Sequence, residues 1–507
     1  MQKYMTPHYL RSIAADKEKL SLFGAIGLTL AALAWLAFRT GTRFDRIRYP
    51  CQRASLQIVL LGIPLVGSFV VGNTARKKKW SKKKIVSLVL GLLGASIVLL
   101  IASNSYIFTV IYSTLSPEMS YAQNKDLTIT ELHSDEPVST VYVARGRDAG
   151  GALQSLVSLM DEKGVSIYST SQREGIIGKE DTVLIKINGE WQERGGTNTD
   201  LLKAFIQKVV DHPEGFVGEV VVVENGQWAI YLDSDRSNAE DRTQSFQEVV
   251  GYFENQGHKV SLYDWTQIGG TAGEVIVIEE NEREKDGYVD MPGGVSYPIF
   301  TTKFGTRISL KDGIWKEGEY DNSQLKFINM PVLKSHSLMG LTGATKHYMG
   351  VLSTSLCNDG FDQHQGMIDE GLMGRMMAQV IYPDLNLMDA NYIGVSSRGP
   401  ASSYETAYKA NLVLAGQDPI ALDYYAGKYI LYPLTRFERH NPDCQDVKKT
   451  PSYGRYPYNA FHQYLASSEK ELKKTGYRIT MDEKEIQVFV AASPPNESPM
   501  ITRTNIE

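Results

Sequence analysis

Cysteine is scarce in this chain of 507 residues, which holds three: Cys51, Cys357 and Cys444. They lie far apart and form no CxxC pair, so the sequence offers no cysteine ligand set for structural zinc or an iron–sulfur cluster. We therefore expect neither as a cofactor, and the cofactor stays unknown. Cys357 and Cys444 could form a disulfide in an oxidising compartment, and two unpaired thiols are an alternative at least as good.

Acidic residues are nearly absent from the first 116 residues, which hold 16 Lys and Arg but, of Asp and Glu, only Asp16, Glu18 and Asp45. The rest of the chain has 37 basic and 55 acidic residues, a net charge of −18. A domain this acidic repels phosphate backbones, so we expect no nucleic acid as a partner. The basic excess near the N-terminus indicates membrane topology and lipid contact instead.

Charged residues are missing from three stretches, Ser21 to Phe38, Leu56 to Gly72, and Ile85 to about Tyr112. Each is near or above the roughly 20 residues that cross a bilayer, so residues 1–116 are predicted to be a membrane anchor of three hydrophobic helices. The middle stretch is short and contains Pro64 and three glycines, which leaves a re-entrant hairpin open. The first stretch lacks a small-residue cleavage site and is not expected to be a cleaved signal peptide.

The loop between the second and third stretches sets the expected orientation. It carries seven Lys and Arg between Arg76 and Lys84, and the positive-inside rule places such a loop in the cytoplasm. We therefore expect an integral protein of the plasma membrane, in contact with the lipid bilayer, with its large domain outside the cytoplasm. The first loop disagrees, because it would place five arginines outside if all three stretches span.

The remainder divides into a linker, a domain and a tail. Residues 117–137 are polar and without periodicity, which is typical of a linker, and the polar, Pro-rich residues 493–507 predict a disordered tail. Between them, residues 138–492 alternate strand and helix signals, which predicts an α/β domain with a mainly parallel sheet and helices on both faces. A β-rich insertion is expected at 274–320. The expected strands are 138–144, 182–188, 217–224, 259–263, 326–333, 385–390 and 411–414, and the expected helices are 152–163, 200–211, 246–255 and one that starts at Pro419.

The most unusual passage runs from Lys334 to Gly350, KSHSLMGLTGATKHYMG, and follows an apolar strand. If Leu341 to Tyr348 is a helix, Thr342 and Lys346 share one face, and the glycine-rich turn offers backbone N–H groups to an anion. A second predicted strand ends in VLIKIN, and ligands bind at the carboxyl ends of strands in open parallel sheets. The predicted residues for binding a small-molecule ligand are Lys186, Asn188, Lys334, Thr342 and Lys346.

Each of these residues also has an ordinary explanation, because glycine-rich turns are common and lysines on helices are usually solvated. The cluster is more telling than its members, since two His and two Lys fall within 14 positions of a chain with nine His. It is not a Walker A loop, because GxxxxGK[ST] is absent and the nearby GATK lacks the spacing.

Carboxylates supply a second candidate set. Asp418 precedes Pro419 and is expected to cap a helix. Asp423 is less easily explained by capping, and Asp389 follows an apolar run. Together with histidines, including His364, such carboxylates suit acid–base chemistry or a hard divalent metal, although no spacing rule here demands a metal. The predicted catalytic residues are His336, His347 and Asp423.

The motif stands in a longer ordered pattern. INMPVLKSHSLMGLTGATKHYMG is followed by Asp389 after an apolar strand, by Arg398-Gly399-Pro400, and by LVLAGQDPIALD. This pattern, covering roughly Val138 to Tyr432, resembles the domain of unknown function 362 family, and VLIKIN resembles that family's first lysine and asparagine motif. The resemblance implies an α/β domain with a ligand crevice and no general established activity. Many members carry ferredoxin-like cysteine motifs for iron–sulfur clusters, which this chain lacks, and the hydrophobic N-terminus is a further departure.

Three functions stay open at this point. The first is an extracytoplasmic enzyme or binding domain for a small anionic or phosphate-bearing ligand, in which lysines supply charge and histidines transfer protons. The second is a metal-dependent hydrolase or transferase that uses the His and Asp residues. The third is a non-enzymatic, membrane-tethered scaffold, in which the motif only shapes the fold. Convergence of the side chains on one edge of the sheet would favour the first two over the third.

Overall fold

The chain forms two units in the computed structural model, Met1–Tyr112 and Ser113–Glu507. The predicted membrane anchor falls almost wholly outside the described residues. Among the residues that are described, no helix is long and apolar enough to cross a membrane. The structure describes residues 32, 81, 122, 125–227, 230–268, 275–282, 284–353, 362–395, 403–449, 456–491 and 501–505.

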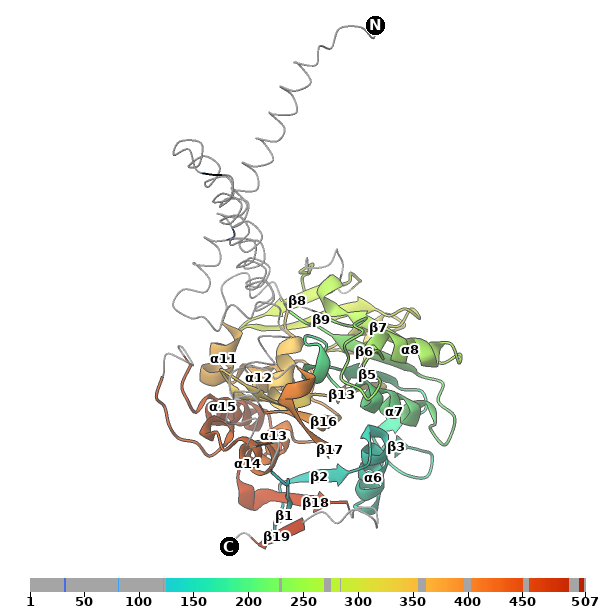
Figure 1. Cartoon of the computed structure of the whole chain (residues 1–507). Coiled ribbons are helices and arrows are strands. Elements are labelled where there is room, and N and C mark those ends of the chain that lie inside the picture. Colours follow the sequence, from blue (N-terminus) through green and yellow to red (C-terminus); the bar gives the residue numbers. More distant parts are fainter. Residues whose placement is uncertain are drawn as a thin grey trace. The chain divides into compact units, whose positions relative to one another are not determined.

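A ten-stranded, mostly parallel sheet forms the centre of the second unit (Figure 1). Its strands run parallel to their neighbours, except that β17 is antiparallel to both β2 and β16 and β15 is antiparallel to β14. The predicted α/β class is confirmed. The order across the sheet is β18 (Ile486–Val490), β2 (Ser139–Arg145), β17 (Ala407–Gly416), β16 (Leu385–Gly394), β13 (Leu325–Asn329), β5 (Thr182–Lys186), β6 (Glu219–Glu224) and β7 (Val260–Asp264), and β14 (Val332–His336) joins β16 and carries β15 (Gly340–Thr342).

Alternate residues of the central strands enter two separate hydrophobic cores. Val183 and Ile185 of β5 belong to one core, whereas Leu184 belongs to the other. Because side chains alternate along a strand, this division means that both faces of the sheet are covered. The first core also holds the buried sides of three helices, which cover one face (Figure 1): α6 (Ala149–Glu162), α7 (Thr199–Val210) and α8 (Phe246–Glu254).

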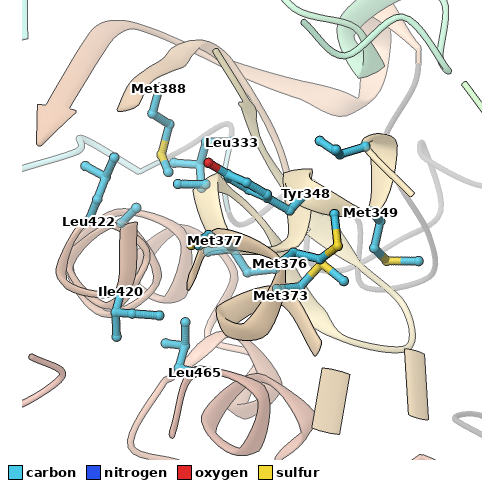
Figure 2. Close-up of a cluster of buried hydrophobic side chains, with 14 of the residues drawn as sticks. Leu333, Tyr348, Met349, Met373, Met376, Met377, Met388, Ile420, Leu422 and Leu465 are labelled. Carbon is cyan, nitrogen blue, oxygen red and sulfur yellow. The ribbon is translucent and has the colours of Figure 1, made fainter. Parts of the chain in front are cut away.

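The second core is rich in methionine. Figure 2 shows Met373, Met376 and Met377 of one helix gathered beside Tyr348 and Met349. Methionine side chains are flexible and fill irregular spaces, so they suit the junction of a sheet with several short helices. The helices of this face are α9 (Ala344–His347), α11 (Gln363–Glu370), α12 (Leu372–Gln379), α13 (Pro419–Tyr425), α14 (Tyr432–Thr435) and α15 (Ala460–Lys474).

Helix starts follow the expected capping chemistry. The side chain of Asp418 accepts hydrogen bonds from the backbone N–H groups of Ile420 and Ala421, and Pro419 occupies the first turn of α13. The predicted cap is confirmed. Ser245 and Glu248 form a reciprocal capping box at α8, which satisfies backbone donors that a helix start leaves without partners.

The predicted β-rich insertion is also confirmed. It forms a five-stranded antiparallel sheet that lies in the chain between β7 and β13. Gly293 and Gly294 both have positive φ angles, 79° and 77°, in the turn of its first hairpin, where a side chain would be strained. Its strands are β8 (Gly287–Met291), β9 (Val295–Thr301), β10 (Arg307–Ser309), β11 (Gly313–Lys316) and β12 (Glu319–Asp321).

The segment after β14 differs from the prediction. The expected helix from Leu341 to Tyr348 is instead the short strand β15, followed by the single-turn helix α9 and a 3₁₀ turn. Gly340 has a φ of +79°, which turns the chain back so that Thr342 pairs with Lys334. Thr342 and Lys346 therefore do not share a helix face.

Two further strands lie in segments that were expected to be a linker and a disordered tail. β1 (Ile129–His133) pairs in parallel with β19 (Ile501–Asn505). Two more short strands, β3 (Tyr168–Ser169) and β4 (Ile177–Gly178), form a separate parallel pair. Isolated strands of this kind depend on a partner that is distant in sequence, which local composition does not reveal.

Candidate functional site

The strand order contains a topological switch point. From β5 the chain adds β6 and β7 on one side, and it then crosses to place β13 and β16 on the other side. In open α/β sheets, ligands bind outside the carboxyl ends of the strands at such a point. Lys186 is the last residue of β5 and is the register partner of Asn329, the last residue of β13. The predicted ligand-binding residue Lys186 therefore lies at the switch point.

Lys186 is a fully bonded ammonium. Its Nζ atom lies 2.9 Å from Glu224 Oε1, 2.9 Å from the carbonyl oxygen of Ile187 and 3.1 Å from His347 Nε2. An ammonium has three N–H donors, and these contacts use all of them. The side chains of Lys186 and Glu224 are each 2% exposed. Burial lowers the pKa of Lys186, and the charge of Glu224 acts in the opposite direction.

His347 is held at both ring nitrogens. Lys186 donates to Nε2, so the ring proton is on Nδ1, which lies 2.7 Å from Asn329 Oδ1. Asn329 in turn donates through Nδ2 to Asn386 Oδ1, at 2.8 Å. Burial lowers the pKa of His347 well below its usual value. His347 is therefore a neutral ring with no free nitrogen lone pair for a metal.

Lys334 and Lys346 are bonded quite differently. Lys334 Nζ donates to the carbonyl oxygen of Gly195 and lies 5.5 Å from the centre of the Trp191 ring. Lys346 Nζ contacts Met349 Sδ at 3.2 Å, and a thioether is a weak acceptor. Within the described ranges, neither ammonium forms an ion pair with a carboxylate. Each therefore retains donors without a strong acceptor.

The pKa values of these two lysines reflect that environment. Burial lowers the pKa of Lys334 to about 7 and that of Lys346 to about 8. The carboxylate of Glu190 opposes both shifts, and the cations Lys346 and Lys186 add to the lowering at Lys334. These mutual effects place the three lysines in one electrostatic cluster, which we call the lysine cluster: Lys186, Lys334 and Lys346.

The loop after β5 supplies two polar groups to the site, the carboxylate of Glu190 and the side-chain amide of Asn188. Trp191 Nε1 donates to Glu190 Oε2 at 3.1 Å, and burial raises the pKa of Glu190. The backbone of Asn188 is fixed by Thr197 Oγ1 at 2.8 Å. Its side-chain Oδ1 is buried and has no hydrogen-bond partner in the described part of the chain. A buried polar atom without a partner costs free energy that a ligand would recover.

His336 and His364 form a neutral ring pair close to Lys346. The Nδ1 atom of His336 accepts from the backbone N–H groups of Leu338 and Met339, at 3.2 and 3.1 Å, so its proton is on Nε2. The ring centres of His336 and His364 are 5.4 Å apart. Burial and the charge of Lys346 lower the pKa of both rings well below the usual value. His364 Nε2 is buried without a partner among the residues that the structure describes.

Asp423 holds the backbone that carries part of the cluster. Its Oδ1 accepts from Ala344 N at 2.6 Å and its Oδ2 from Thr345 N at 2.8 Å. Burial raises the pKa of Asp423 to about 7. A Cβ at Gly343 would lie 2.1 Å from Oδ1, so a glycine is needed for this close approach. Asp423 fixes α9, and through it the positions of Lys346 and His347.

Asp389 likewise fixes backbone, in this case at the start of α7. Its Oδ2 accepts from Asn198 N at 2.9 Å and its Oδ1 from Asn391 Nδ2 at 2.8 Å. Asn198 caps α7 and ends the loop that contains Glu190. Among the described residues, no group of three His, Cys, Asp or Glu side chains is placed to hold a metal ion. Cys444 is a buried free thiol, and Cys357 lies outside the described residues.

The structure thus brings together the predicted Lys186, Lys334, Lys346 and His347, with His336 beside Lys346. Thr342 lies opposite Lys334 in the β14–β15 pair. The sequence interpretation missed the members of the site that are acidic or amide-bearing, and Trp191. One signal was available, because the apolar run VVVV of β6 is followed by the buried Glu224 at the end of the strand. The missed residues are Glu190, Trp191, Glu224 and Asn329.

The fold and site define an α/β protein with a largely buried lysine cluster at a switch point of its sheet. The family model Domain of unknown function (DUF362) matches residues 320–428, so this part of the chain carries a DUF362 domain. The match includes Lys334, Lys346 and Asp423 but not β5 or the loop after it. Neither the curated proteins nor the solved structures give a match.

Proposed function

We propose that the domain binds, or acts on, a small anionic ligand such as a phosphate-bearing or carboxylate compound, at the carboxyl edge between β5 and β13. One observation carries the proposal: Lys334, which is buried, and Lys346, which is partly buried, are two cations of one cluster with no ion-pair partner in the described residues. The formal charges of the three lysines exceed those of Glu190 and Glu224 by one. A bound anion supplies the missing countercharge.

The energetics favour an anion over a purely structural cluster. Burying an unpaired ammonium is costly, whereas a buried charge with a hydrogen-bonded partner is tolerated. Lys186 already has such a partner in Glu224, at 2.9 Å. Lys334 and Lys346 have one hydrogen-bond acceptor each, so the two ammonium groups offer donors that phosphate or carboxylate oxygens accept well.

The residues around the lysines have distinct parts in this proposal. Lys186 adds positive charge but has no donor left, so its part is to hold His347 in place. The unsatisfied Oδ1 of Asn188 is an acceptor, so it suits a hydroxyl group of the ligand and not its anionic oxygens. His336 presents a neutral ring with its proton on Nε2, which is suited to donate a hydrogen bond or a proton. Asp423 positions the α9 backbone and does not need to touch the ligand.

Removing either unpaired lysine should abolish stabilisation by anions. A ligand at about 100 times its Kd stabilises a protein by roughly 2.7 kcal/mol, and Lys334→Met or Lys346→Met removes an ammonium while keeping most of the side-chain volume. Thermal unfolding of the full chain in detergent, with inorganic phosphate, pyrophosphate and citrate as probes, measures the effect.

The matched control is Lys474→Met, which removes a lysine that is 56% exposed at the end of α15 and should leave the anion response unchanged. The proposal fails if the Lys334→Met and Lys346→Met proteins fold and still respond to the three anions as the unaltered protein does.

We propose further that the domain works outside the cytoplasm, tethered to the lipid bilayer by residues 1–116. The support is the set of three hydrophobic stretches and the cationic loop from Arg76 to Lys84. A C-terminal alkaline phosphatase fusion, which matures in oxidising compartments, should be active in bacterial cells, and a C-terminal cytoplasmic-folding fluorescent fusion should be dark. The reverse pair of results would place the domain in the cytoplasm.

A further inference from the structure

Lys334 differs from the other lysines of the cluster in its surroundings. Its side chain is almost fully buried, at 1% residue exposure. Its ammonium has a single carbonyl acceptor, Gly195 O, and lies over the ring of Trp191. The cations of Lys346 and Lys186 act on it, together with the carboxylates of Glu190 and Glu224. Low solvation and neighbouring cations are the conditions that turn a lysine into a nucleophilic amine.

We propose that Lys334 is a nucleophile that forms an imine with a small anionic carbonyl compound, such as a 2-oxo acid or a keto-phosphate, whose charged group is bound by Lys346. The proposal rests on the anion site described above and names its ligand class. It assigns covalent chemistry to the lysine cluster in addition to binding.

The protonation state of Lys334 supports this assignment. Burial lowers its pKa from 10.5 to about 7, so at neutral pH about half of its population is the free amine. An ordinary lysine carries roughly a thousandfold less free amine at that pH. Imine formation requires the amine lone pair, which makes Lys334 the most reactive lysine of the cluster.

The other two lysines are suited to different parts. Lys186 donates to three acceptors, including Glu224 at 2.9 Å, and this full set of bonds holds it as an ammonium. Lys346 is partly exposed, and its pKa of about 8 keeps it mainly protonated at neutral pH. A protonated Lys346 attracts the carboxylate or phosphate of the ligand, and its charge favours the amine form of Lys334.

The chemical step balances with the groups present. The Nζ lone pair of Lys334 attacks the carbonyl carbon, the π pair of the C=O bond moves to oxygen, and a proton passes from nitrogen to that oxygen to give a carbinolamine. Glu190, whose pKa is raised by burial, gives a proton to the hydroxyl group, which leaves as water. The product is an iminium at Lys334 beside the Glu190 carboxylate, and no oxidant or reductant is consumed.

Borohydride trapping tests the proposal. The full chain in detergent is incubated near neutral pH with pyruvate, 2-oxoglutarate or dihydroxyacetone phosphate and then reduced with sodium borohydride. Reduction fixes the imine as a secondary amine, so peptide mass mapping should find Lys334 carrying the mass of the carbonyl compound less one oxygen atom. The yield at Lys334 should exceed that at any exposed lysine by about tenfold or more, because of its larger amine fraction.

Variants separate the roles. Lys334→Arg keeps a positive charge but lacks a nucleophilic amine at this pH, so it should give no adduct at residue 334. Lys346→Met should lower the trapping yield, because the ligand loses the cation that binds its charged group, and should shift the pH midpoint of the remaining trapping upward, because Lys334 loses a neighbouring cation. The position of the adduct in the unaltered protein already decides whether Lys334 is the nucleophile.

The outcomes also distinguish this inference from the anion site itself. Thermal stabilisation by phosphate, without an adduct from any of the three carbonyl compounds, overturns the imine and leaves the anion site standing. Adducts spread over lysines according to their exposure overturn it as well, as does an adduct confined to Lys346. If neither stabilisation nor adduct is found, both proposals are wrong.

Discussion

Replacing Lys186 with Met should destabilise the domain by roughly 3–5 kcal/mol, the cost of leaving one member of a buried ion pair without its partner. Glu224 is 2% exposed in its side chain and would remain without the ammonium that lies 2.9 Å away. His347 would also lose the donor at Nε2. Because His347 and Asn329 are hydrogen-bonded to each other, the destabilisation should extend to the ends of both β5 and β13. The midpoint of urea unfolding measures it.

The pH dependence of stability in the Lys186→Met protein tests whether the unpaired Glu224 carboxylate causes the loss. Burial already raises the pKa of Glu224, and without Lys186 its pKa rises further. A raised folded-state pKa gives stability that is present at low pH and lost as the pH rises through that value. The destabilisation should therefore deepen between weakly acidic and neutral pH. A loss that does not change over this range would place its origin elsewhere.

A double variant provides the matched control. Adding Glu224→Gln to Lys186→Met removes the orphan charge, while the amide oxygen still accepts from Gly189 N or Asn225 N. Most of the lost stability should return, since removing both charges of a buried pair is often nearly neutral. For comparison, Lys473→Met breaks an i, i+4 pair with Glu469 in which the lysine side chain is 51% exposed, and it should cost less than about 1 kcal/mol. A double variant no more stable than Lys186→Met would contradict the ion-pair explanation.

The sequence predicted the main sheet because its strands are buried on both faces. Runs such as VVVV in β6 are apolar without alternation, which is typical of parallel strands between two helix layers. The expected strand at 326–333 was less accurate, since the chain forms β13 and β14 instead. Pro331 lies between them and has no N–H to donate to a ladder. That break directs Lys334 into a strand of its own beside β16.

The candidate site was only partly accessible from sequence. Lys186, Lys334 and Lys346 stand at the ends of apolar strands or in a glycine-rich turn, and strand ends are where ligands bind in such sheets. Glu190 and Trp191 belong to a loop without periodicity, so nothing local indicated that they approach Lys334. Their placement depends on a hydrogen bond from Thr197 Oγ1 to Met330 O at 2.9 Å, between residues 133 positions apart in the sequence.

Asp423 shows why residue type alone does not assign a role. As a carboxylate five positions into DPIALD it was predicted to be catalytic, and the structure has both of its oxygens on the backbone of α9. The contact spans 79 residues of sequence. It exists because Gly343 leaves room for it, and because the first N–H groups of any helix, α9 included, have no partner within the helix. A cap of one helix by the side chain of another is a tertiary event, and capping rules for sequence describe only local ones.

Anion affinity should fall by roughly a thousandfold between about pH 6.5 and about pH 9, because the two unpaired lysines lose their charge over this range. The folded-state pKa values are about 7 for Lys334 and about 8 for Lys346, both below the usual 10.5. A lowered lysine pKa means that stability is present at high pH and is lost as the pH falls through the folded-state value. The ligand-free protein is therefore less stable at low pH, and there a bound anion stabilises it most.

Binding should accordingly take up protons. A phosphate next to Lys334 and Lys346 favours their ammonium forms, so calorimetric titrations near pH 8 should give heats that depend on the ionisation enthalpy of the buffer. Lys346→Arg keeps its charge throughout this range, which should reduce the fall in affinity to that of Lys334 alone, roughly a hundredfold. Affinity that stays constant from about pH 6.5 to about pH 9 in the unaltered protein would contradict the assignment of these lysines to the anion.

The same titration separates simple binding from imine formation. Phosphate needs both lysines protonated, so its affinity should decrease steadily with rising pH. A carbonyl anion needs Lys334 as the amine and Lys346 as the ammonium, a combination that is most populated between their pKa values of about 7 and about 8. Trapping by borohydride should therefore pass through a maximum in that interval, on a bell-shaped curve. Phosphate and carbonyl anions then report opposite protonation states of a single side chain, Lys334.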